Sequence, residues 1–346
     1  MITPAAATGI GSLPGADSHE WARTIAGELP EFPHVPELPA RGPGADMVGR
    51  TMSLLAEVAP DLAVETTPAG WRFADAPGRV MTRARSWLAE DLDGIEQALT
   101  GRATPLKEQL VGPWTLAAAI EMRNGERAVR DVGACRDIAE ALAEAVMRHA
   151  GEIARRMPSA QIVIKLVEPS LPSGLAGGLT TASGLATYRS VDVGRAESHL
   201  AWVLSAATGA GALAGVHCCH PRAPIDLLRK AGARLLSIDP AVLEGAAEEP
   251  LGAALEDGVL LLLGYAPALP REVSGPQMVA ESVAARALEQ YSRWGIPVDI
   301  ANAHVALTPA CGLAGADPAW VRTVYAALGI AGRLVRDDAP VESEES

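Results

Sequence analysis

The segment GVHCCH, residues 215–220, places two histidines and two cysteines at four successive positions. Side chains alternate across a β-strand, so His217 and Cys219 would face one way while Cys218 and His220 face the other. Imidazole and thiolate are usual ligands of zinc, and either pair could therefore begin a zinc site. Two ligands do not complete such a site, so further donors must come from elsewhere in the chain.

Two further donors lie at or after the ends of later strands. Asp239 closes the run SID, twenty residues after Cys219 (239 − 219 = 20), and Cys311 lies in TPACG. The carboxyl ends of barrel strands converge on one rim, which would bring these donors to His217 and Cys219. The set has the borderline-soft character that suits zinc. The competing interpretation is that each cysteine is an inert buried hydrophobe, as single cysteines commonly are.

Runs typical of buried strands alternate with amphipathic stretches along the whole chain. Near-continuous apolar runs such as QIVIKLVEP and GVLLLLGYAP are typical of parallel strands that are buried on both faces. We expect strands at residues 6–12, 62–66, 106–112, 162–168, 212–219, 234–239 and 259–264, with weaker candidates at 34–38 and 298–306.

Helical patterns fill the intervals between these strands. The helices expected cover 135–157, 276–294 beginning at Pro276, and a stretch capped by Asp317 that continues to about residue 333. Alternation over the whole chain predicts a parallel α/β fold. Because no GxGxxG follows the first strand, the sequence favours a single-domain (β/α)8 TIM barrel over residues 1–336, with a doubly wound sheet as the alternative. The acidic residues 337–346 are expected to form a disordered tail.

Composition excludes several classes of function. The 346 residues include 42 acidic and 29 basic side chains, which gives a net charge of −13 and argues against nucleic-acid binding. Mean hydropathy is +0.15, but no apolar run is long enough to span a membrane, and the N-terminus lacks the basic and apolar regions of a secretory signal. Four cysteines do not form a disulfide framework. We therefore expect a cytoplasmic protein with no membrane partner.

Seven short motifs follow one another along most of the chain. They are TGIGSLP (8–14), ADMVGR (45–50), LVGPWT (110–115), VEPSL (167–171), GVHCC (215–219), SID (237–239) and PACGL (309–313). In order and approximate spacing they resemble the C-terminal catalytic barrel of cobalamin-independent methionine synthase, in the superfamily that includes uroporphyrinogen decarboxylase, in a core-only form that lacks the family's amino-terminal barrel. The resemblance implies a zinc-dependent transfer of a methyl group from a methyltetrahydrofolate-type donor to homocysteine.

The resemblance implies the zinc ligands His217, Cys219, Asp239 and Cys311, and so selects the first of the two strand pairs. Asp239 departs from the family pattern, which has a glutamate there. Zinc would lower the pKa of a substrate thiol, since the thiolate is the nucleophile. The general acid is unknown, because GYAPALPR stands where the family has its catalytic histidine.

The resemblance also indicates residues that would bind substrate. Backbone N–H groups of Ile10, Gly11 and Ser12, with the Ser12 hydroxyl, could receive a substrate carboxylate. The family's two acids that hold the homocysteine amino group correspond to Gly49 and Val167, so the adjacent Asp46 and Glu168 would have to substitute. The basic and aromatic residues that hold the methyl donor in the family have no clean match here, and Trp71, Arg72, Arg79 and Trp114 are available nearby.

Two alternatives remain open at this point. The methyl donor could be a corrinoid such as methylcobalamin, carried by a corrinoid protein as partner, and the acceptor could be another small thiol. The chain could also be a non-catalytic zinc-binding barrel. The glycine-rich stretch 173–184 lacks the Lys-Ser/Thr ending of a phosphate-binding loop and is expected to be a plain connection or a loop over the barrel mouth.

Overall fold

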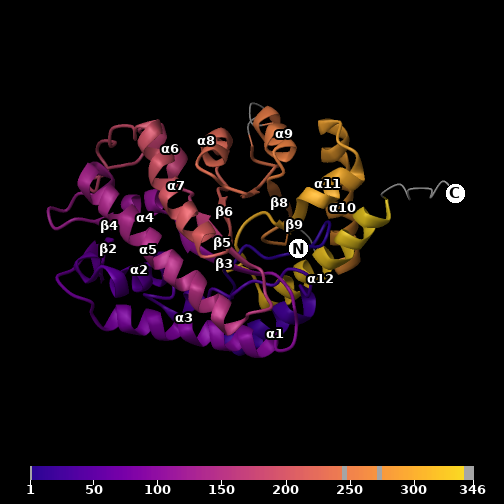
Figure 1. The fold of residues 1–346 in the computed structure, drawn as a ribbon, viewed down its shortest axis with the longest axis horizontal. Coiled ribbons are helices and arrows are strands. Elements are labelled where there is room, and N and C mark those ends of the chain that lie inside the picture. Colours follow the sequence, from indigo (N-terminus) through magenta and orange to yellow (C-terminus); the bar gives the residue numbers. More distant parts are fainter. Residues whose placement is uncertain (1, 244–247, 271–274, 339–346) are drawn as a thin grey trace.

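Six parallel strands form one curled sheet in the computed structural model, which describes residues 2–243, 248–270 and 275–338. Helices cover the outer side of the sheet (Figure 1). In spatial order the strands are β3 (Leu106–Val111), β5 (Ile162–Val167), β6 (Leu213–His217), β7 (Leu235–Ile238), β8 (Leu260–Ala266) and β9 (Val305–Pro309). The predicted α/β barrel-like fold is therefore confirmed.

Two extended segments lie between β9 and β3. Ala7 bridges Leu307 of β9, and His34 bridges Lys107 of β3, each in the parallel sense. A third parallel bridge joins Ser12 to Glu37 and so links the two segments to each other. The predicted strands at 6–12 and 34–38 thus make single bridges, and regular strands occupy six of the eight positions expected.

Aspartates begin the helices that surround the sheet. Asp17, Asp46, Asp131, Asp192 and Asp317 each accept a backbone N–H in the first turn of the helix that follows, which satisfies donors that have no partner inside the helix. The helices are α1 (Ser18–Glu28), α2 (Met47–Val58), α3 (Arg79–Ala98), α4 (Pro113–Ala119), α5 (Val132–Arg156), α6 (Leu171–Leu175), α7 (Val193–Gly209), α8 (Ile225–Lys230), α9 (Glu248–Glu256), α10 (Pro276–Trp294), α11 (Val298–His304) and α12 (Pro318–Asp337).

Two sequence predictions of barrel strands are wrong. The run at 62–66 contributes β1 (Val64–Thr67), which pairs antiparallel with β2 (Gly70–Phe73); with β4 (Ile120–Glu121) they form a separate small sheet. The run at 298–306 is mostly helix α11, because the Asn302 side chain donates to the Val335 carbonyl (3.1 Å) and docks this turn against α12. The predicted tail begins inside α12, and residues 339–346 lie outside the described residues.

The inside of the curled sheet has an apolar floor and a polar layer above it. Val163, Leu235 and Leu262 pack with Phe32 in the floor. Side chains two residues further along a strand face the same way, so Lys165 and Ser237 lie above Val163 and Leu235. The polar residues therefore lie toward the carboxyl ends of the strands, where barrel enzymes hold their sites. None of the helices in the described part of the chain is long and apolar enough to cross a membrane.

Candidate functional site

His217 is the last residue of β6 and is almost completely buried. Its Nδ1 atom makes a hydrogen bond with the Ser237 hydroxyl on the neighbouring strand at 2.9 Å. Burial lowers the pKa of His217 well below its usual value, and the charges of Lys165 and Lys107 lower it further. The imidazole is therefore neutral near pH 7, which is the form that ligates metals.

The thiols of Cys219 and Cys311 meet in a side-chain hydrogen bond, although the residues are 92 positions apart (311 − 219 = 92). Cys219 is half-buried and Cys311 is exposed, so solvent reaches the pair. The hydrogen bond raises the pKa of Cys219 and lowers that of Cys311 to about 6, because one thiol donates to the other sulfur. Cys219 follows the carboxyl end of β6, and Cys311 follows the carboxyl end of β9.

Cys218 and His220, the alternative pair of zinc ligands, follow β6 and lie in different surroundings. Cys218 is fully buried, its backbone N–H donates to the Ser237 carbonyl (3.0 Å), and burial raises the pKa of its thiol to about 12. His220 lies in the next turn, where its Nδ1 accepts the backbone N–H of Arg222 at 3.1 Å. The thiol of Cys219 therefore pairs with that of Cys311 and not with either of these side chains.

Asp239 directly follows β7 and is half-buried at the same rim. Its Oδ1 accepts the backbone N–H of Ala241 (2.9 Å), burial raises its pKa, and its charge acts on the Cys311 thiol. A cavity of about 540 Å³ opens beside Asp239 and is also lined by Arg286, Ala310 and Trp320. Space for a small molecule therefore lies beside Asp239 and beside Ala310, the residue that precedes Cys311.

The donor types at the rim fit zinc, but the described conformation does not gather them around one point. Two thiols in contact, a neutral imidazole and a carboxylate are the ligand classes that zinc prefers. Across residues 2–243, 248–270 and 275–338, however, no three His, Cys, Asp or Glu side chains are grouped closely enough to hold a metal ion. His217 and Asp239 would have to approach the thiols for all four predicted donors to bind together.

Two buried lysines lie beneath the thiols, and the sequence alone did not identify them as site residues. Lys165 Nζ donates to the Ile10 carbonyl at 2.8 Å, and Lys107 Nζ donates to the same oxygen at 3.3 Å and to Gln109 Oε1 at 2.8 Å. Burial lowers the pKa of Lys165 to about 8, although Glu37 and the two thiols oppose that shift. A single lysine inside the apolar run IVIKLV was the signal, because a charge within a buried strand needs a polar partner.

The IGS segment packs against the turn that carries Cys311. Gly11 has a φ of +151°, and a Cβ there would lie 2.6 Å from Gln109 Cδ, so the turn has no room for a side chain. The Ser12 hydroxyl touches the Gly312 backbone closely enough to exclude a side chain at that glycine, and the Leu313 N–H donates to the Ser12 carbonyl (2.9 Å). Ser12 therefore lies beside the thiol site, while the Ile10 carbonyl is already occupied by the lysines.

Glu168, Asp46 and Trp114, which the sequence also predicts to bind substrate, each make hydrogen bonds within the fold. Both Glu168 oxygens accept bonds at the start of α4, from Trp114 N (2.9 Å) and from Thr115 N and Oγ1 (2.8 and 2.7 Å); burial raises the pKa of Glu168 to about 7. Asp46 caps α2 and accepts from Trp71 Nε1 at 3.1 Å. Trp114 Nε1 donates to the Ala196 carbonyl at 3.1 Å.

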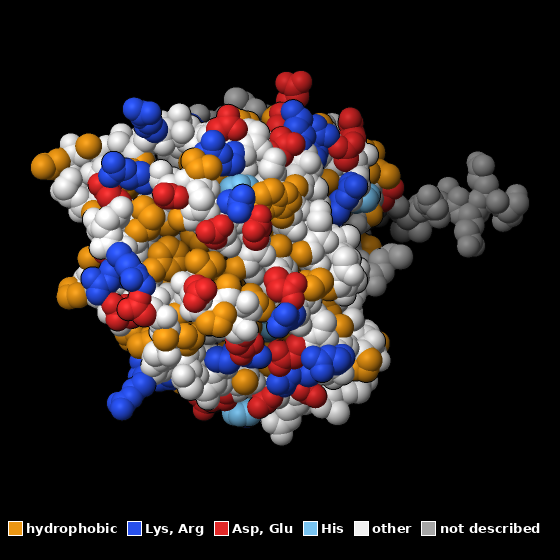
Figure 2. All heavy atoms as spheres, turned by 60° about the vertical axis from the view of Figure 1, so that its left-hand side comes forward, with side chains coloured by type: hydrophobic (Ala, Val, Ile, Leu, Met, Phe, Trp, Pro, Cys, Tyr) orange, Lys and Arg blue, Asp and Glu red, His pale blue; other side chains and the backbone are white. Residues whose placement is uncertain are grey.

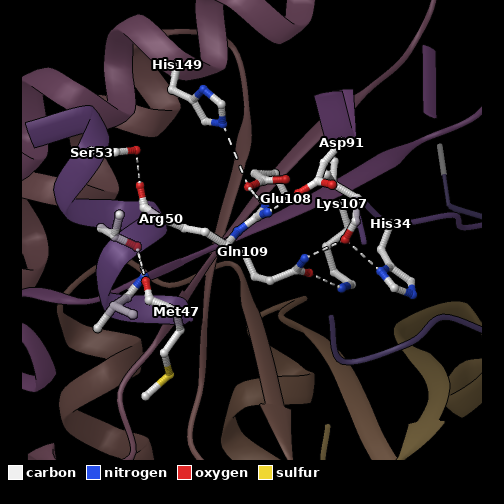
Figure 3. A network of polar contacts seen from close by, with 12 residues as sticks. His34, Met47, Arg50, Ser53, Asp91, Lys107, Glu108, Gln109 and His149 are labelled. Atoms are coloured by element: carbon white, nitrogen blue, oxygen red, sulfur yellow. Dashed lines mark hydrogen bonds and ion pairs between the residues drawn. The ribbon is translucent and has the colours of Figure 1, made fainter. Parts of the chain in front are cut away.

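A buried ion network lies on the outer side of β3. Arg50 reaches from α2 to Asp91 of α3 and to Glu108 of β3, where Nη2 lies 3.2 Å from Oε1 (Figure 3). His149 of α5 lies 3.8 Å from the same Glu108 oxygen. Glu108 thus faces the helices, while its neighbour Lys107 faces the inside of the sheet, as strand alternation requires. This network holds β3 against three helices and lies apart from the thiol pair.

Comparison with known proteins gives similarity in structure but not in sequence. No protein-family profile matches the chain, and no curated protein matches it. A B12-independent methionine synthase from Shewanella sp. W3-18-1, solved with selenomethionine, superposes with a TM-score of 0.59 at 11% identity, covering 96% of this chain and 98% of that chain. A β-mannanase from the blue mussel Mytilus edulis superposes with a TM-score of 0.46 at 11% identity, covering 95% of this chain and 92% of that chain.

The superposition with the methionine synthase supports a TIM-barrel-like fold, which agrees with the curled parallel sheet and its covering helices. Because one barrel fold supports many unrelated reactions, the activity has to be argued from the residues of the rim.

Proposed function

We propose that this chain is a zinc-dependent methyltransferase that moves a methyl group onto the sulfur of a small thiol. Homocysteine is the acceptor and a methyltetrahydrofolate-type compound is the donor in this proposal. The observation that carries it is the contact between the thiols of Cys219 and Cys311 at the carboxyl ends of two barrel strands. Two solvent-accessible thiols in contact are suited to binding a soft metal ion.

The residues around the thiols would support that chemistry. Ser237 fixes the ring of His217, and burial keeps the imidazole neutral, so a ring nitrogen is available as a ligand. The buried ammonium of Lys165 acts on both thiols and would offset the negative charge of cysteinate and aspartate donors. Zinc held by His217, Cys219, Asp239 and Cys311 would lower the pKa of an acceptor thiol to give a nucleophilic thiolate.

The cavity beside Asp239 offers room for the acceptor. Arg286 lines this cavity, where its Nη1 donates to the Tyr265 carbonyl at 2.7 Å. In the proposed reaction Ser12 is the polar group of the IGS segment nearest the Cys311 turn and would orient the acceptor there. The thiol site and the cavity then hold the two ends of one small amino-acid thiol.

The activity test uses the zinc-loaded full chain with homocysteine and either methyltetrahydrofolate or methylcobalamin. Methionine is measured by mass spectrometry. We expect methionine from methyltetrahydrofolate, loss of that product in Cys311→Ser, and retention in Cys135→Ser, which removes a buried thiol on α5. Product from methylcobalamin alone would make the corrinoid alternative correct, and no product from either donor would contradict a methyltransferase.

The metal test is independent of turnover. X-ray absorption of the zinc-loaded chain should give two sulfur ligands together with nitrogen and oxygen, and Cys219→Ser and Cys311→Ser should each lower the zinc content. Full zinc occupancy in both variants would show that the ligand set is wrong. Zinc binding by the predicted ligands without methyl transfer would favour the non-catalytic zinc barrel.

A further inference from the structure

A second cavity, of about 760 Å³, lies where helices α5 and α7 begin. Its walls come from the segment before α5 and from residues 181–191, which continue the glycine-rich stretch. These elements lie on the left of Figure 1, the side that Figure 2 turns forward, where hydrophobic side chains gather beside basic ones. The volume is within the range of small-molecule sites.

Three arginines line this cavity in a chain whose net charge is −13. Arg130 is paired with Glu126, with Nη1 and Oε1 2.6 Å apart. In the described part of the chain, the guanidinium groups of Arg189 and Arg195 have no hydrogen bond and no ion pair. The charge of Arg195 nevertheless acts on Cys135 and His199, which lie on the two flanking helices. Glu126 also lines the cavity and pairs with Arg130, so the guanidinium groups of Arg189 and Arg195 are the two of the three that have no ion pair among the described residues.

The amino-terminal ends of two helices also lie at the cavity. Helix α5, of 25 residues, and helix α7, of 17 residues, both point their amino-terminal ends toward the cavity, since Val132 and Arg195 of their first turns line it. The amino-terminal end of a helix carries a partial positive charge, but Asp131 and Asp192 cap these two ends and accept N–H groups of their first turns. The positive character of the cavity therefore comes from the guanidinium groups of Arg189 and Arg195.

Aromatic and apolar residues also line the cavity, and hydrogen bonds and stacking hold them in place. Trp114 is buried and stacks on His199, with ring centroids 5.1 Å apart and planes 7° from parallel. Tyr188 fastens the outer loop, because its hydroxyl accepts the Arg127 N–H at 3.0 Å and donates to Glu126 Oε2 at 2.8 Å. Val132 and Val191 complete the apolar lining. The surface is therefore formed before any ligand arrives, which limits the entropy cost of binding.

We propose that this cavity binds a small molecule in which a carboxylate or a phosphate is attached to an apolar, ring-sized body. Arg189 and Arg195 bind the oxyanion, and the side of the cavity that contains Trp114 and Val132 packs against the body. The inference does not rest on the proposed methyl transfer, because none of the four predicted zinc ligands lines this cavity. A guanidinium is suited to this role, since its planar fork matches the geometry of both oxyanions.

Calorimetric titration of the full chain tests the proposal with four probes: phenyl phosphate, benzoate, inorganic phosphate and phenol. We expect phenyl phosphate or benzoate to bind about tenfold or more tightly than both inorganic phosphate and phenol, because both parts of the ligand contribute. Whichever of the two binds better identifies the oxyanion. Equal affinity for phenol and the two ring anions would overturn the proposal.

Variants assign the binding to this cavity. Arg189→Gln with Arg195→Gln should weaken the best probe by about tenfold or more, while Arg148→Gln, an exposed arginine on α5 outside the cavity, should leave it unchanged. Circular dichroism checks that each variant folds. Unchanged affinity in the folded double variant would contradict the assignment.

A substitution at one exposed position separates charge from folding. Val132 is 55% exposed and begins α5, so a longer side chain fits there. Val132→Glu should weaken binding more than Val132→Lys does, although a carboxylate at that position favours the helix, because both variants lose the apolar contact and only the glutamate repels an oxyanion. Equal affinities in the two variants would show that the bound probe is not an anion held in this cavity.

Discussion

At the scale of single residues, the polar layer inside the sheet combines groups that oppose one another. Lys107 and Lys165 are buried together and share one backbone acceptor, the carbonyl of Ile10. Burial lowers the pKa of both lysines, so the protein is less stable than it would be with neutral side chains at these positions. Such a cost is typical of functional positions, and it identifies Lys165, which acts on both thiols, as a residue that supports the site.

Replacing Lys165 by methionine should increase stability and decrease activity. Its pKa is about 8 in the folded chain against 10.5 unfolded, so the folded state binds fewer protons between these values and stability rises with pH there. Below that window Lys165→Met should gain roughly 1–3 kcal/mol in the free energy of unfolding, because the charge is removed and the volume is kept. Urea denaturation at pH 7 measures the gain, and methyl transfer should fall at least about tenfold. A less stable variant with full activity would contradict both expectations.

Glu168 should make stability depend on pH in the opposite direction. Its pKa is raised from 4.5 to about 7 by burial, so the folded state binds more protons than the unfolded state between these values. The stability it contributes is present below pH 4.5 and is lost as pH rises through 7, by roughly 3 kcal/mol. Urea denaturation across this pH range should show a smaller decrease in the free energy of unfolding for Glu168→Gln than for the unchanged protein. Parallel curves for the two proteins would contradict the raised pKa.

The sequence could identify the candidate rim residues but not all of their surroundings. Strand alternation alone separates His217 and Cys219 from Cys218, because a period of two is a local property. The pKa of Lys165 depends on Glu37, which lies in a separate extended segment, and on thiols that follow other strands. Nor could the sequence indicate that Glu168 accepts three bonds from the start of α4, because that requires the placement of a whole helix.

At the scale of helices and strands, the predicted bounds agree with the structure where a local sequence signal marks both ends of the element. Helix α10 begins at Pro276 and ends before Gly295, whose φ of +65° stops a helix, and the predicted bounds agree with Pro276–Trp294. The run at 298–306 has Val298 and Ile300, which favour a strand locally, but contacts with α12 make most of it helical. Tertiary contacts that override local preference cannot be read from neighbouring residues.

The turn between β3 and α4 should tolerate no side chain at Gly112. A Cβ there would overlap the Glu168 carboxylate, which is itself fixed by three hydrogen bonds. Gly112→Ala should therefore lose about 1–3 kcal/mol in the free energy of unfolding, as overpacking does. Gly151→Ala is the matched control inside α5, where nothing lies within 4 Å of the added atom, and it should gain about 1 kcal/mol. Equal effects in denaturant titrations would show that the contact with Glu168 is unimportant.

At the scale of the whole molecule, zinc should act as a stabilising ligand of the folded chain. A ligand that binds only the folded state adds about 2.7 kcal/mol at a concentration one hundred times its Kd. Scanning calorimetry should therefore show a Tm that rises with zinc concentration, and Cys219→Ser with Cys311→Ser should abolish the rise. Magnesium is the control, because it prefers oxygen ligands. A zinc-dependent rise that persists in the double variant would assign the metal to other residues.

The bridge between Ala7 and Leu307 also has a consequence for folding. It joins residues 300 positions apart (307 − 7 = 300), so the first extended segment cannot find its partner until the last strand exists. During synthesis this seam stays open at least until residue 307 has been made, so the pairing of these two distant segments comes late. Pairings of such long range are slow, and the unsealed edge is meanwhile open to other chains.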